Sequence, residues 1–83
     1  MTYDEIYNDC CNNKYDNSAK EFKSIIIAFL ANEYNLLDEA AEVIFNYAYE
    51  SGHSAGFYEV LDYADKYGQM YSEIRSANHM REV

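Results

Sequence analysis

The sequence contains no proline and no tryptophan, and only three of its 83 residues are glycine. Strands and hairpins need frequent turns, and glycine and proline are the strongest turn signals, so their scarcity favours an all-helical fold. The only two cysteines, Cys10 and Cys11, are adjacent, and neighbouring cysteines are poorly placed to close a disulfide. A disulfide framework is therefore excluded.

Long apolar segments are absent as well. The longest apolar run, residues 25–31, is far shorter than the roughly 20 residues that a membrane-spanning helix needs. The N-terminus lacks the basic and then apolar pattern of a secretory signal. We therefore expect a cytoplasmic protein that forms a single domain over residues 1–83.

Positive charge is scarce: six Lys and Arg stand against 15 Asp and Glu, which gives a net charge of −9. Direct phosphate recognition starts from a basic surface, so this balance argues against binding to nucleic acid and favours a basic partner. Residues 24–65 contain no Lys or Arg, although ordinary exposed helices pair Glu with Lys one turn away. The same stretch holds eight carboxylates: Glu33, Asp38, Glu39, Glu42, Glu50, Glu59, Asp62 and Asp65.

Helical periodicity is present along most of the chain. Thr2 to Glu5 and Ser18 to Glu21 fit capping boxes, and apolar residues at helical spacing follow both. We predict an all-α helical bundle with one short N-terminal helix and three longer helices, of which the helix beginning at Ser18 is central. Residues 76–83 are expected to fray.

The apolar residues of the longer helices define the predicted core. Asn35 is expected to end one helix and cap the next, and the segment from Gly52 to Gly56 is expected to break the chain between the last two helices. Two glycines four residues apart could instead let another backbone approach closely. The predicted buried positions are Phe22, Ile25, Ile26, Phe29, Leu30, Leu37, Ala40, Ala41, Ile44, Phe45, Ala48, Phe57, Val60, Leu61, Ala64, Tyr67, Gly68, Tyr71 and Ile74.

Three short patterns resemble functional motifs. Gly52-x-Ser54-x-Gly56 matches a nucleophile elbow, but that motif needs a strand before the serine and a large parallel sheet. Residues 62–73 begin and end like a calcium loop, but they lack its internal ligands. The two histidines and the adjacent cysteines match no common zinc spacing. We therefore expect no catalytic residue, no cofactor and no metal, and the protein is expected not to be an enzyme.

The acidic stripes provide the candidate binding residues. Carboxylates one helical turn apart are roughly 6 Å from one another, close to the spacing of phosphates along one strand of a duplex. We expect these side chains to form one acidic surface, with tyrosines as contact anchors. The residues assigned to partner binding are Glu39, Glu42, Glu50, Glu59, Asp62, Asp65, Tyr49 and Tyr58.

The segment from Tyr49 to Val60 resembles a segment of small early proteins of tailed bacteriophages. The resemblance implies a class of host-defence inhibitors, such as anti-CRISPR proteins, and no functional residue. The leading hypothesis is a phage or mobile-element inhibitor that binds the basic nucleic-acid-binding surface of a bacterial complex in the host cytoplasm. The alternative is a structural or adaptor protein that forms a homo-oligomer, such as a homodimer, and whose acids serve solubility.

Overall fold

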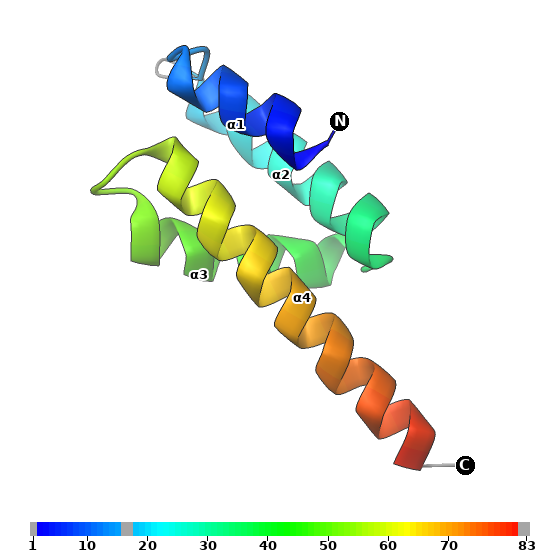
Figure 1. Ribbon diagram of the computed structural model, residues 1–83. Coiled ribbons are helices and arrows are strands. Elements are labelled where there is room, and N and C mark those ends of the chain that lie inside the picture. Colours follow the sequence, from blue (N-terminus) through cyan, green and yellow to red (C-terminus); the bar gives the residue numbers. More distant parts are fainter. Residues whose placement is uncertain (1, 16–17, 82–83) are drawn as a thin grey trace.

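A computed structural model describes residues 2–15 and 18–81, with side chains to residue 75. These residues form four α-helices and no strand: α1 (Tyr3–Cys11), α2 (Ala19–Tyr34), α3 (Asp38–Gly52) and α4 (Phe57–Arg81) (Figure 1). The predicted all-α bundle of one short and three longer helices is confirmed.

Helix α4 is the element that packs against all three others, while α2 packs against α3 and α4. Figure 1 shows α4 crossing α3 diagonally. Helices α1 and α2 lie side by side near the N-terminal half of α4. The ring of Phe22 stacks on Phe57 of α4 at 4.5 Å and meets the edge of Phe45 of α3 at 6.0 Å. Helix α2 contacts the other three helices as well, since the ring of Phe29 lies 6.5 Å from that of Tyr3 in α1, so α2 and α4 share the centre of the bundle.

The helix ends agree with the sequence in part. The predicted capping box at the start of α1 is present: the Glu5 amide donates to Thr2 Oγ1 and the Thr2 amide donates to Glu5 Oε1. Ser18 precedes α2 but makes no side-chain cap. Asn35 does end α2, in a left-handed conformation with φ of 53°, a region that Asn tolerates better than most residues.

The predicted N-cap at Asn35 is wrong, since α3 begins only at Asp38 and Leu37 is the residue before it. The backbone of Leu37 is extended, and neighbouring side chains along an extended backbone point in opposite directions. Leu36 is therefore buried, whereas Leu37 is 72% exposed, contrary to the prediction that Leu37 lies in the core.

The break between the last two helices is confirmed. Residues 53–55 form a turn, and Gly56 follows with φ of +138°, which L-residues rarely adopt. Gly52 remains within α3 and is buried against α4, so the close approach considered as the alternative is present too. Ser54 lies exposed in the turn after a helix and does not cap α4.

The C-terminal half of α4 extends past the bundle, as Figure 1 shows. Tyr71 is 44% exposed and Ile74 is 58% exposed, so their predicted burial is wrong. The apolar pattern continues there, but α2 and α3 have already ended. Helix α4 reaches Arg81, and the fraying of residues 76–83 stays a prediction, with Glu82 and Val83 outside the described residues. In the described chain, no helix is long and apolar enough to cross a membrane.

Candidate binding surface

The acids of α3 lie together on one side of the helix. Its buried residues are Ala41, Ile44, Phe45, Ala48 and Gly52, which face α2 and α4. At about 100° per residue, the polar positions occupy roughly a third of the circumference, on the side turned away from these residues. We call this set the acidic face of α3: Asp38, Glu39, Glu42, Asn46, Tyr49 and Glu50, all of them exposed.

One residue of the acidic face has a cationic neighbour. Lys23 of α2 lies 3.9 Å from Glu42, and both side chains are well exposed. An exposed pair of this kind contributes little stability, typically less than about 1 kcal/mol. Among the described residues, Glu39 and Glu50 form no ion pair, so the face keeps most of its negative charge. Tyr49 lies at one edge of the face, where its ring stacks on His53 at 4.8 Å and stays partly exposed.

The acids of α4 have a different environment, because two of them accept hydrogen bonds from tyrosines of other helices. Asp62 accepts from the hydroxyl of Tyr3 in α1 at 3.3 Å, and Asp65 accepts from the hydroxyl of Tyr34 in α2. These bonds hold α4 against α1 and α2. Asp62 and Asp65 therefore have structural roles that their place in the acidic pattern of the sequence did not indicate.

The tyrosine pKa values reflect these contacts. Burial, together with the charge and hydrogen bond of Asp62, raises the pKa of Tyr3 to about 12. Burial and the bond to Asp65 raise the pKa of Tyr34 further. Tyr15, buried in the turn after α1, donates to Asp9 at 3.0 Å, and its pKa is also raised to about 12, mainly by burial. A tyrosinate at any of these positions would be both desolvated and opposed by a carboxylate.

The two remaining residues of the predicted set also lie on α4. Tyr58 meets the ring of Tyr7 of α1 edge-on at 6.5 Å, on the same side as Asp62. Glu59 is half-buried where its backbone passes Gly52. The eight predicted residues thus form two groups instead of one surface: Glu39, Glu42, Glu50 and Tyr49 on α3, and Tyr58, Asp62 and Asp65 beside α1 and α2, with Glu59 at the crossing of α3 and α4.

Sequence reasoning did not identify the tyrosine partners. Tyr3 and Asp62 are 59 residues apart, and Tyr34 and Asp65 are 31 apart. Neither separation carries a local signal. The excess of tyrosine over other aromatic residues was the available indication, since a half-buried hydroxyl usually needs a partner.

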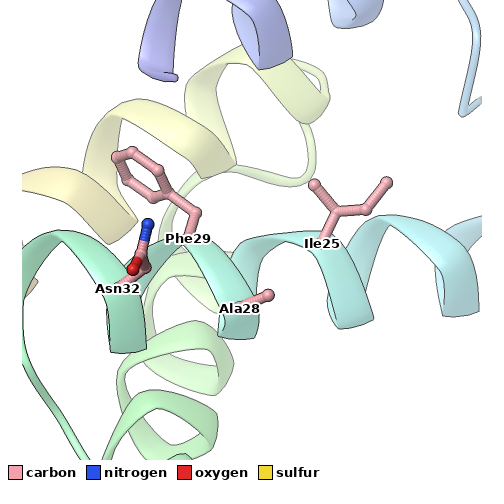
Figure 2. Close-up of a pocket in the computed structure, with 4 residues that line it drawn as sticks. All are labelled: Ile25, Ala28, Phe29 and Asn32. Carbon is pink, nitrogen blue, oxygen red and sulfur yellow. The ribbon is translucent and has the colours of Figure 1, made fainter. Parts of the chain in front are cut away.

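A shallow hollow of about 230 Å³ lies on α2 and is lined by Ile25, Ala28, Phe29 and Asn32 (Figure 2). Asn32 is the one polar side chain in this lining, and none of the four residues titrates. Proton transfer or nucleophilic attack has no side chain to carry it in this hollow. In the part of the chain that the structure describes, no group of three His, Cys, Asp or Glu residues converges as a metal site would require.

Comparison with protein-family models, with curated proteins and with solved structures found no match. The resemblance of residues 49–60 to phage early proteins therefore stays a prediction.

Proposed function

We propose that this protein is a non-enzymatic binding protein whose acidic face on α3 contacts a basic surface of a partner protein. The observation that carries the proposal is the gathering of Asp38, Glu39, Glu42 and Glu50 on one exposed side of a single helix, with one weak cationic neighbour. Asp38 and Glu39 stabilise the first turn of α3 through the helix dipole, but Glu42 lies one turn from both, and like charges at that spacing repel one another. A basic partner would relieve that repulsion on binding.

The partner class follows from the charge and the resemblance together. Proteins that bind nucleic acid present extended surfaces of Lys and Arg that neutralise phosphates, and an acidic helix could compete for such a surface. We therefore propose an inhibitor, encoded by a phage or mobile element, that acts in the bacterial cytoplasm on a defence complex such as a CRISPR effector. Along α3, successive acids would occupy positions that phosphates otherwise take.

The second group of predicted residues has a smaller part in this proposal. Asp62 and Asp65 already accept hydrogen bonds from tyrosines, and Tyr58 packs against Tyr7. Because these contacts hold α4 in place, changes there would alter folding as well as binding. The acidic face of α3 is the cleaner surface to test.

The test compares two double charge reversals with the same change in net charge. Glu39→Lys with Glu50→Lys alters the first and last turns of α3, and Glu21→Lys with Glu33→Lys alters the corresponding exposed turns of α2. Tagged proteins are incubated with lysate from a CRISPR-bearing bacterium at low and high salt, and captured proteins are identified by mass spectrometry.

We expect the wild type and the α2 variant to retain the same nucleic-acid-binding complex at low salt and to lose it at high salt. The α3 variant should lose it at both. Equal capture by the two variants would contradict the proposal, as would the absence of any captured complex. The latter result would favour the alternative in which the acids serve solubility.

A further inference from the structure

Among the side chains that the structure describes, several apolar ones on the C-terminal half of α4 are exposed to solvent. Met70 is 50% exposed, and Tyr71 and Ile74 are comparably exposed, although the three residues continue the stripe that begins at the half-buried Tyr67. At helical spacing, Tyr67, Met70, Tyr71 and Ile74 occupy one side of the helix. We call these four residues the α4 stripe. Exposed apolar residues that continue a buried pattern are typical of an interaction surface.

The charge around the stripe differs from that of the rest of the molecule. Residues 66–81 contain three bases, Lys66, Arg75 and Arg81, and one acid, Glu73, in a chain whose net charge is −9. Residues 24–65, by contrast, contain eight acids and no base, so contacts between copies through that stretch would bring acid against acid. Self-association through the end of α4 therefore meets less repulsion than association through residues 24–65.

The edges of the stripe are also self-complementary. Lys66 and Glu73 are seven residues apart, so they lie on the same edge of the stripe, about 10 Å from each other along the helix. Both are exposed, and Glu73 accepts a weak hydrogen bond from Gln69 at 3.5 Å. The opposite edge holds Arg75, which donates to the carbonyl of Asn35.

We propose that two copies of this chain associate through their α4 stripes, with the helices antiparallel about a two-fold axis. This symmetry brings like edges together in opposite directions, so that Lys66 of each copy meets Glu73 of the other. Two reciprocal ion pairs then lie along one edge of a seam that is centred on Met70. An antiparallel second copy presents Lys66 and Glu73 in the reverse order along the helix. The two copies are therefore complementary in charge by symmetry alone, whereas another protein would need its own matching charges.

The size of the seam sets the strength of the dimer. Stable interfaces bury about 800 Å² on each partner, and four half-exposed residues with their flanking charges offer less than that. We expect a reversible dimer with a dissociation constant on the order of 10 to 100 µM. The acidic face of α3 lies on another helix and stays free, so the dimer would present it twice.

The dimer and the proposed function are independent of each other. Charge reversal on α3 leaves the seam unchanged, and association of the pure protein is measured with no partner present. A failure of one can therefore be distinguished from a failure of the other.

The experiment is sedimentation velocity on the full chain over a concentration series, with circular dichroism to confirm that each variant is folded. Met70→Ser should abolish association, because Met70 lies next to the two-fold axis at the centre of the seam. Leu37→Ser is the matched control, since Leu37 is the more exposed of the two and lies outside the stripe. It should associate like the wild type.

Charge exchange tests the antiparallel symmetry itself. Lys66→Glu alone and Glu73→Lys alone each place like charges opposite one another, and each should weaken association about tenfold. The double variant, and an equimolar mixture of the two single variants, should associate within about twofold of the wild type. A wild type that remains monomeric to about 1 mM would overturn the proposal, given the expected affinity. So would single and exchanged variants that associate equally well.

Discussion

Gly52 of α3 lies directly against the backbone of Val60 in α4, and a Cβ atom at Gly52 would be only 2.9 Å from the Val60 amide nitrogen. It would be equally close to the carbonyl carbon of Glu59. Backbone atoms cannot yield as the tip of a side chain can, so this contact fixes the distance at which α3 and α4 cross. The orientation of the acidic face of α3 depends on that crossing.

Replacing Gly52 with alanine should therefore destabilise the fold. A methyl group forced into a packed backbone contact costs about 1–3 kcal/mol of unfolding free energy, more than alanine gains in helix propensity. Urea unfolding measures the difference. Ser54→Ala, two residues on in the exposed turn, is the control and should stay within about 0.5 kcal/mol of the wild type. Equal stability of the two variants would mean that α3 and α4 cross elsewhere.

The tyrosine and carboxylate contacts predict a loss of stability at alkaline pH. Tyr3 and Tyr15 have pKa values of about 12 in the folded chain and near 10 when unfolded, so between these values the folded state binds more protons. The unfolding free energy must then fall as pH rises from 10 to 12, with the full contribution present below pH 10.

Phenylalanine variants test this assignment. In Tyr3→Phe with Tyr34→Phe, the decline of unfolding free energy above pH 10 should be shallower, because two titrating groups have been removed. Tyr47→Phe is the control, since Tyr47 is exposed and makes none of these bonds. Urea unfolding across the pH range gives the slopes. A double variant that declines as steeply as the control would rule out the bonds to Asp62 and Asp65.

The left-handed residue at the end of α2 gives a third prediction. Asn35→Gly should leave stability unchanged or raise it by a few tenths of a kcal/mol, since glycine adopts positive φ without a steric cost. Asn35→Val should lower it by about 1–2 kcal/mol, because a β-branched side chain clashes in that conformation. Thermal unfolding of both variants supplies the comparison, and similar melting temperatures for the two would show that residue 35 is not left-handed.

The pair of Lys23 and Glu42 gives a fourth. Lys23→Ala should cost less than about 1 kcal/mol, because both partners are exposed and 3.9 Å apart. In a Glu42→Gln background, the unfolding free energy lost on Lys23→Ala should not change with salt concentration. A large, salt-sensitive loss in the wild type alone would mean that the acidic face is already neutralised within the molecule.

The sequence predicted those features that depend on neighbouring residues. Periodicity located all four helices, Thr2 and Glu5 identified the first cap, and Gly52 to Gly56 marked the break. The sequence pattern does not show where a neighbouring helix ends in space. It therefore predicted burial for Tyr71 and Ile74, which lie beyond the reach of α2 and α3. It also could not pair Asp62 with Tyr3 or Asp65 with Tyr34, because those contacts depend on how α4 packs. The acidic residues were identifiable, but their division between two surfaces was not.

Carboxylate footprinting of the captured complex measures whether the acidic face of α3 contacts the partner. Carbodiimide labelling followed by mass spectrometry reports the accessibility of each acid in the free and bound chain. We predict that Glu39, Glu42 and Glu50 lose labelling on binding, while Glu21 and Glu33 of α2 label equally in both states. Full labelling of the three α3 acids in the complex would show that this face does not contact the partner.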